Sequence, residues 1–586
     1  MKKVNRAPEP MNYFKLALAG LLRHRHPSEI AGDLRRAKAK GYTGIWIEND
    51  YVAAGKPAES HFGNNWRLFD LFDFTLARKC EPYREYLRQV CGLCERYGLD
   101  VYVSFWMPRL GPEFLAYLQK RHPNAIGRSD GFVAKGVPCL CTCEAGEGLA
   151  ILERMVQQFM CDFPQVRGLK IATEDNGAYN CESNCPNAHG TSRARHAANM
   201  FATVQRAMLA VRSDAQLLLY PWFWRDGYEQ EILSQLTDNY LVVTKMEQGA
   251  IQKLESDEPG KPLFDSSIVA DKPGPLFLDW VKRVGSDRIV DMVPVGTGID
   301  DFFLANPPYP GRLHRRFQNL AKQGVLRFLD FECGGHCKGS GEEAVALFNQ
   351  SPKLSEPVFL SRLAGRIYRS PQARRAAIAG WQAFDEGFGK LPIGLGGTKS
   401  PIASGRFGFA WSMCIATPLL PHMFGGERRH EIHWFSPYNF FTAEAAPRLE
   451  FHFLQVLARW QEAARHLSVA EAQDDHSPAS VREAIAAQAH VLSLRCTLHW
   501  CLGAQLADDK SGPDLFNDLM RAEVALTVEF MKLRDVHPWI WANNCWHPHL
   551  TPLSQKGIAD GLAKHKDTFT AKIKVMKKAL RELRKL

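Results

Sequence analysis

The chain has 586 residues, of which 45% are hydrophobic and 23% are charged. This composition predicts a globular protein with one large core, and the length leaves room for a second. Most of the net charge of +10 comes from residues 564–586, which hold nine Lys or Arg and two acidic residues. Apolar residues recur there at helical spacing, which predicts a helix. We therefore favour the interpretation that the charged residues form its solvated face. Binding of an anionic glycan or a nucleic acid is the less favoured alternative, because no zinc-finger, RNA-recognition or basic-zipper motif is present.

The first 30 residues show no secretory signal. The apolar run from Leu16 to Leu22 is too short for a signal core and leads into a basic run that ends at Pro27. The sequence also shows no stretch with the length and hydrophobicity of a membrane span. We therefore expect a cytoplasmic protein with no membrane partner, unless a leader was removed, and self-association is left open.

Strand-like apolar runs alternate with helical patterns through the first 340 residues. Strands are expected at 14–20, 44–48, 101–105, 169–173, 217–222, 241–244, 289–295 and 325–331. Helices are expected at 27–41, 82–97, 149–160, 192–211, 275–284 and 313–323. Eight strands with intervening helices predict an α/β fold, the (β/α)8 TIM barrel. A doubly wound sheet is the main alternative, but no GxGxxG sequence follows the first strand.

The strand pattern fades after residue 340. Helical patterns cover 354–388, 447–466, 481–506 and 514–533. A segment rich in Gly, Pro and aromatic residues lies at 391–439 and is a connector with the composition of a lid. We therefore expect a catalytic barrel at 1–340 and a mainly α-helical C-terminal domain at 341–586.

The end of the fourth expected strand is the strongest candidate for chemistry. Here the apolar run GLKIA leads into Thr173-Glu174-Asp175-Asn176. A buried strand end fixes a carboxylate and removes part of its water, which raises its pKa toward that of a general acid. Active sites of such barrels lie at the C-terminal ends of the strands. The other candidate carboxylates there are Asp300, Asp301, Glu332 and Glu247, and the candidate substrate-binding residues are Arg23, His24, Asn49, Asp50, Trp106, Arg109, Asn176, Trp222, Trp224, Lys245 and Trp434.

These residues also have ordinary structural explanations. Glu174 and Asp175 could cap the loop that follows them, a Trp at a strand end is often part of the core, and basic side chains often face solvent. We favour function because carboxylates and tryptophans crowd one rim. Carboxylate pairs suit acetal hydrolysis, and flat aromatic faces suit sugar rings.

The 15 cysteines are scattered, and their odd number argues against a complete disulfide framework. Cys139, Cys141 and Cys143 alternate along the chain, which suits small buried side chains on one face of a strand. Cys181 and Cys185 are candidates for a local disulfide or for half of a zinc site. Zinc is the less favoured interpretation, because the spacing is unusual and no clean second pair accompanies it. Cys333, His336 and Cys337 could contribute further ligands from another loop.

Several short motifs follow one another along the chain. They are Thr173–Asn176 with a Cys-containing loop after it, Phe264–Ser267 with Gly274-Pro275, Pro308–Pro310, and Gly334-Gly335. In this order they resemble a bacterial glycoside-hydrolase-type barrel family with a C-terminal helical domain, related to β-N-acetylhexosaminidases and α-glucuronidases. The resemblance covers residues 10 to about 390. The family's Trp-Glu after strand seven is replaced here by Gly298-Ile299-Asp300-Asp301, so the second carboxylate is displaced and Glu332 competes for its role.

The residues and the resemblance together predict an exo-acting glycoside hydrolase with Glu174 as general acid. Asp300 or Asp301 is the expected second carboxylate, with Glu332, Glu247 and Asp175 in reserve. The expected partner is a glycoside or oligosaccharide with an acidic or N-acetylated sugar, and no metal or other cofactor is expected. One alternative is a carbohydrate-binding barrel without catalysis. The other is a metal-dependent sugar lyase or isomerase that uses His24, His26, Glu48, Asp50 and His336.

Overall fold

The structure is a computed structural model that describes most of the expected elements. The described residues are 13–20, 27–48, 74–106, 112–128, 138–172, 181, 185–189, 191–221, 224, 228–251, 272–293, 295, 306–330, 339–391 and 446–508, with scattered helical positions between 518 and 536. They include every strand of the expected barrel and most of the expected helices.

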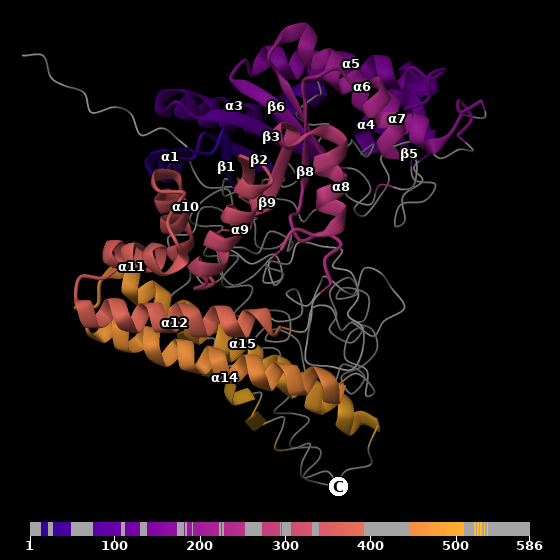
Figure 1. Ribbon diagram of the computed structural model, residues 1–586. Coiled ribbons are helices and arrows are strands. Elements are labelled where there is room, and N and C mark those ends of the chain that lie inside the picture. The colour runs from indigo at the N-terminus through magenta and orange to yellow at the C-terminus, as the bar shows by residue number, and fades with distance from the viewer. Residues whose placement is uncertain are drawn as a thin grey trace, which may run out of the picture.

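Eight parallel strands form a closed barrel (Figure 1). They are β1 (Leu16–Gly20), β2 (Gly44–Glu48), β3 (Asp100–Trp106), β6 (Val166–Ala172), β7 (Gln216–Tyr220), β8 (Tyr240–Thr244), β9 (Ile289–Val293) and β10 (Arg327–Asp330). Neighbours follow chain order, and β10 closes the ring on β1, with Leu18 opposite Leu329. Strands such as YLVVT of β8 are buried throughout, because the interior covers one face and helices cover the other. The predicted (β/α)8 barrel is confirmed.

A ring of helices surrounds the barrel. It comprises α1 (Pro27–Ala39), α3 (Phe74–Tyr97), α5 (Gly148–Asp162), α6 (Arg193–Val211), α7 (Tyr228–Gln235), α8 (Pro275–Val284), α9 (Pro310–Lys322) and α10 (Ser340–Gln350). The last of these completes the ring, since Arg36 of α1 forms an ion pair with Glu342 of α10 (Nε–Oε1 3.1 Å). Phe348 of α10 also stacks on Phe14, just before β1. The eighth helix of the barrel therefore begins at Ser340, and the domain boundary itself stays a prediction.

An insertion between β3 and α5 was not expected from the sequence. It contains α4 (Pro112–Arg121) and an antiparallel pair of short strands, β4 (Ile126–Arg128) and β5 (Pro138–Leu140). Gly127 of β4 lies opposite Cys139 of β5. This small hairpin brings cysteines next to the loop that follows β6.

The region after the barrel is helical, as predicted. It contains α11 (Glu356–Ile367), α12 (Pro371–Gly389), α14 (Ala446–Ala472) and α15 (Pro478–Asp508), the last three lying together as long helices (Figure 1). The expected helix at 354–388 is two helices, because Ser370 caps α12 by accepting a hydrogen bond from the Ala373 N–H and Pro371 follows it. Phe384 of α12 stacks on Trp460 of α14 at 4.6 Å between ring centroids. Within the described residues, no helix combines the length and apolar character that crossing a membrane requires.

Buried polar contacts join the helical region to the barrel. Arg312 of α9 donates to Asp385 of α12 (Nε–Oδ1 2.6 Å). Glu483 of α15 accepts from the Ser340 N–H at the start of α10 (2.7 Å) and from Trp381 Nε1 of α12 (2.9 Å). These contacts involve the first turns of α9 and α10, which follow the ends of β9 and β10. The helical region therefore lies beside the C-terminal face of the barrel, where the active sites of such barrels are found.

Candidate active site at the C-terminal face of the barrel

The described residues include part of the predicted site. The structure describes Glu247, Lys245 and Trp224 with their side chains, and Trp106 by its backbone. The remaining candidates lie outside the described residues: Glu174, Asp175, Asn176, Asp300, Asp301, Glu332, Arg23, His24, Asn49, Asp50, Arg109, Trp222 and Trp434.

Backbone pairing aligns the ends of two strands of the candidate site. β3 and β6 are hydrogen-bonded neighbours, and Trp106 at the end of β3 lies opposite Ala172 at the end of β6. Glu174 follows Ala172 by two residues in the sequence. The last residues of β3 and β6 therefore stand at the same height on the rim.

A buried lysine that the sequence argument did not single out lies in the barrel interior. Lys170 of β6 is 2% exposed, and its Nζ lies 4.7 Å from the Trp46 ring and 5.0 Å from the Tyr220 ring. Trp46 is on β2 and Tyr220 is on β7, and β3 and β6 lie between these strands. A side chain of β6 that contacts both rings must point into the barrel. The signal for it in the sequence was a single Lys within the apolar run GLKIA.

Lys245 extends this interior cluster. It follows β8, is 3% exposed, and its Nζ lies 5.8 Å from the same Tyr220 ring. Two ammonium groups thus approach one tyrosine ring near the C-terminal ends of β6, β7 and β8. Cations on aromatic faces are stabilised more strongly when they are removed from water. The predicted role of Lys245 in substrate binding stays a prediction.

Asp330, at the end of β10, has a structural role. The Tyr42 hydroxyl donates to its Oδ2 (2.9 Å), and the Val295 N–H donates to its Oδ1 (3.1 Å). Trp46 Nε1 donates to its backbone oxygen (2.8 Å). The carboxylate thereby joins β10 to residues before β2 and after β9.

Glu247 faces the helix layer. Its side chain is fully buried, and its Oε2 lies 2.6 Å from Arg316 Nη1 of α9. The same guanidinium binds Asp291 of β9 through Nε (2.7 Å) and Nη2 (2.9 Å). Burial raises the pKa of Glu247 to about 7, against the opposing attraction of Arg316. Because Arg316 comes from a helix outside the barrel, this geometry favours a structural role for Glu247 over a catalytic one.

Trp224 also packs toward the helices. Its ring meets Phe201 of α6 edge-on at 5.7 Å and Trp280 of α8 at 6.0 Å between centroids. It remains partly exposed. These contacts fix the ring between two helices, so they favour a packing role over a sugar platform.

Two other features of the described residues lie apart from this interior cluster. Cys141, Cys143, Cys181 and Cys185 converge beside the hairpin and form a group that could hold a metal ion. A cleft of about 970 Å³ lies between α14, α15 and helical positions 529–536. No barrel residue lines this cleft, so it is separate from the candidate active site.

No protein-family model matches the chain, and no curated protein matches its sequence. Among solved structures, the chain is similar to a GH138 enzyme targeting pectin rhamnogalacturonan II, with a TM-score of 0.56 and 11% identity over 98% of this chain and 69% of that chain. It is also similar to a family 89 glycoside hydrolase from Clostridium perfringens in complex with PUGNAc, with a TM-score of 0.52 and 10% identity over 96% of this chain and 59% of that chain. At such identity the similarity shows the fold alone. The expected likeness to glycoside-hydrolase barrels with a helical C-terminal part is confirmed at that level.

Proposed function

We propose that the chain is an exo-acting glycoside hydrolase with Glu174 as its general acid. The observation that carries the proposal is the buried cluster of Lys170, Trp46 and Tyr220 inside the barrel, in which Lys170 precedes Glu174 by four residues in the sequence. An ammonium group is costly to bury, and a charged side chain among aromatic rings in a barrel interior is typical of a binding site. The fold likeness to glycoside hydrolases supports the same activity.

The spacing along β6 supports the choice of Glu174. Side chains of a strand alternate between its faces, so Lys170, Ala172 and Glu174 share one face if the chain continues extended. Lys170 points into the barrel, and we place the Glu174 carboxyl on the same side. Burial there favours the protonated acid, whereas a nearby ammonium favours the ionised form, and the pH dependence of kcat/KM reports the balance.

The second carboxylate is proposed to be Asp300 or Asp301, with Glu332 and Asp175 as the remaining alternatives. The separation of the two carboxyl groups decides the stereochemistry. About 5 Å corresponds to a retaining mechanism, and about 6.5 to 9.5 Å leaves room for water and corresponds to inversion. Asp175 beside Glu174 also allows a substrate-assisted mechanism, in which one carboxylate orients a 2-acetamido group of the substrate.

The proposed substrate class is an acidic or N-acetylated sugar. Lys170 and Lys245 bring two buried ammonium groups to the Tyr220 ring, and ammonium groups bind carboxylates through charge-assisted hydrogen bonds. One of the similar structures is a family 89 enzyme in complex with 2-acetamido-1,2-dideoxynojirmycin, which supports the N-acetylated alternative. Aryl glycosides of both classes are therefore the substrates with which to begin.

Substitution of Glu174 tests the assignment. Glu174→Gln keeps the size of the side chain but removes the transferable proton. We expect kcat to fall by about 10² to 10⁴ on glycosides with poor leaving groups, since these need protonation in the transition state. Activated aryl glycosides should lose much less. The folded state should be intact, because an isosteric change at a strand end creates no cavity.

Asp300→Asn is the companion variant. If Asp300 is the nucleophile or base, turnover of both substrate types should disappear, because that step depends little on leaving-group quality. Equal losses on good and poor leaving groups for Glu174→Gln would remove Glu174 from the acid role. Rates like those of the unmodified chain would contradict the site assignment.

A further inference from the structure

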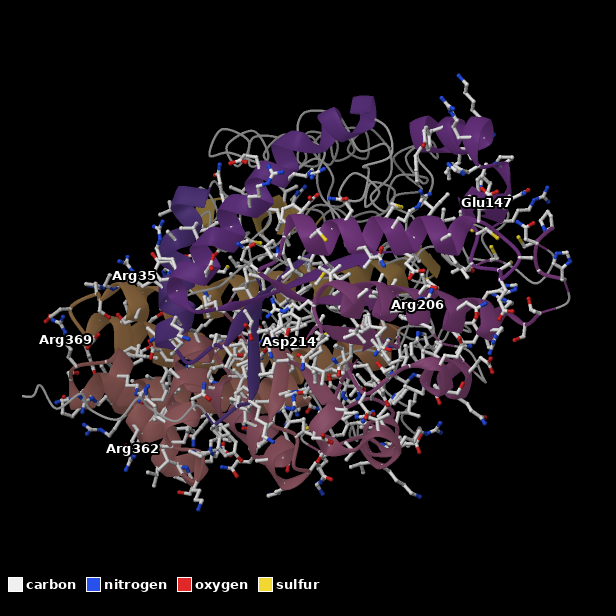
Figure 2. The ribbon with its side chains drawn as sticks, turned by 90° about the horizontal axis from the view of Figure 1, so that it is seen from above. Arg35, Glu147, Arg206, Asp214, Arg362 and Arg369 are labelled. Carbon is white, nitrogen blue, oxygen red and sulfur yellow. The ribbon has the colours of Figure 1, made fainter. Side chains whose placement is uncertain are left out.

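Four cysteine thiols from two separate segments meet beside the barrel. Cys141 and Cys143 follow β5 of the hairpin, and Cys181 and Cys185 lie between β6 and α6. All four side chains are buried, and their Sγ atoms lie within 4.8 Å of one another. Figure 2 shows sulfur atoms gathered near Glu147, at the start of α5. Each segment supplies one pair, so the pair that complements Cys181 and Cys185 is Cys141-x-Cys143, directly after the hairpin.

We propose that Cys141, Cys143, Cys181 and Cys185 bind a single structural zinc ion. A tetrahedral zinc ion with Zn–S bonds of about 2.3 Å holds its sulfur atoms about 3.8 Å apart, so only a small contraction is needed. A cluster of several iron ions requires a wider cysteine set, because inorganic sulfide lies between the metals. Four thiolates without an open position are typical of structural zinc.

The surroundings of the sulfur atoms are suited to thiolates. The Thr142 N–H donates to Cys181 Sγ (3.4 Å), and Asn187 Nδ2 donates to Cys141 Sγ (3.4 Å). Such donors stabilise metal-bound sulfur and orient it. Two glycines make the close approach possible, because a Cβ at Gly127 would lie 2.3 Å from Cys181 Sγ and one at Gly146 would lie 2.5 Å from Cys141 Sγ.

Hydrogen bonds hold the two segments together around the thiols. The Cys181 N–H donates to Thr142 Oγ1 (3.0 Å), and His196 Nδ1 of α6 lies 3.0 Å from the Cys181 carbonyl oxygen. A carbonyl oxygen only accepts, so His196 Nδ1 carries the proton in this contact and is not a ligand. Cys139 is also buried in the same cluster of side chains but lies outside the set of four. It is therefore the natural control.

The zinc site has a consequence for the barrel rim. Cys181 is seven residues after Glu174 in the sequence. The ion would therefore fix the chain a short distance after the proposed general acid. This consequence rests on the proposed function, whereas the zinc site itself does not. All four ligands come from the protein, so the ion takes no part in hydrolysis. The proposed site nevertheless departs from the expectation that the chain binds no metal.

Metal analysis of the full chain tests the proposal. The protein is expressed with zinc in the medium, purified without a metal-affinity column, and analysed for bound elements. We expect about one zinc ion per chain. Zinc should be lost in Cys143→Ser and retained in Cys139→Ser, and the first variant should unfold at a lower temperature than the second.

A second measurement uses the unmodified chain, in case Cys143→Ser fails to fold. A mercurial reagent should release the zinc in step with the modification of four thiols. Three outcomes would overturn the proposal. They are a chain without stoichiometric zinc, a chain with disulfides among the four cysteines, and a chain with stoichiometric iron in place of zinc. Glu174→Gln should bind zinc like the unmodified chain, so failure of the proposed hydrolase activity is distinguishable from failure of the zinc site.

Discussion

At the scale of single residues, one arginine binds two buried carboxyl groups. Asp291 accepts two hydrogen bonds from Arg316 and one from the Met246 N–H (2.7 Å). Glu247 accepts one from Arg316, and its Oε1 has no hydrogen-bond partner among the described residues. One positive charge cannot fully compensate two negative charges in a buried place. Glu247 has fewer donors, so it is the carboxyl group that more readily holds a proton.

This arrangement makes the stability of the protein depend on pH. The pKa of Glu247 is raised to about 7 by burial, above its ordinary value of 4.5. Between these values the folded protein binds more protons than the unfolded chain, so stability falls as the pH rises and the loss is complete above about pH 7. The free energy of unfolding should therefore fall between pH 5.5 and 8.5, and in Glu247→Gln this fall should be smaller by about 2 kcal/mol. Urea unfolding of both proteins at the two pH values measures the difference. Turnover should be unchanged, and a loss of activity like that of Glu174→Gln would return Glu247 to the catalytic candidates.

The sequence pointed to Lys245 as a candidate but not to Lys170, which the structure places in the same interior cluster. Lys245 follows a strand, where a polar residue stands out. Lys170 lies within a strand, where a lysine is ordinarily explained by an amine that reaches solvent from the end of its stem. Its interior position depends on Trp46 of β2 and Tyr220 of β7, which only closure of the barrel brings together.

At the scale of elements, long apolar strands were predictable and the short hairpin was not. Strands buried on both faces, such as β7 and β8, give continuous apolar runs. The hairpin strands have three residues each, too few for any periodicity. The alternation of Cys139, Cys141 and Cys143 was expected on one strand face, but β5 ends at Leu140 and the last two cysteines turn toward Cys181. A metal site assembled across segments in this way has no signature in local spacing.

The contact between α9 and α12 is a second test at this scale. Asp385 accepts from Arg312 (2.6 Å) and from Arg315 Nη2 (2.7 Å), and it is 8% exposed. Asp385→Asn removes the charge that faces both guanidinium groups and should cost about 2 to 3 kcal/mol in the free energy of unfolding. The neighbouring Glu386 pairs with Arg459 at the surface, so Glu386→Gln should cost less than about 1 kcal/mol. Similar losses for the two variants would show that the contact does not stabilise the junction.

At the scale of the whole molecule, the helical region and the barrel share one core. Tyr309, just before α9, is fully buried, and its ring lies 5.1 Å from Phe388 and 6.3 Å from Phe384 of α12. Glu483 of α15 binds the first N–H group of α10, where the positive end of the helix favours a carboxylate. The sequence predicted a helical domain packed on the barrel. The sequence could not predict that α9 and α10 would be the barrel helices that contact this domain, because the apolar faces of both helices also pack on the barrel.

A chain that ends after Gln350 would separate the barrel from the helical region. Such a chain keeps all eight strands and the eighth helix of the barrel, so any defect comes from the lost helical region. We expect it to aggregate, because Tyr309 would be exposed and Arg312 would lose its carboxylate partner. Co-expression of residues 351–586 as a separate chain should restore solubility, measured by size-exclusion chromatography. A 1–350 chain that stays soluble, monomeric and as active as the full chain would show that the helical region is a removable domain.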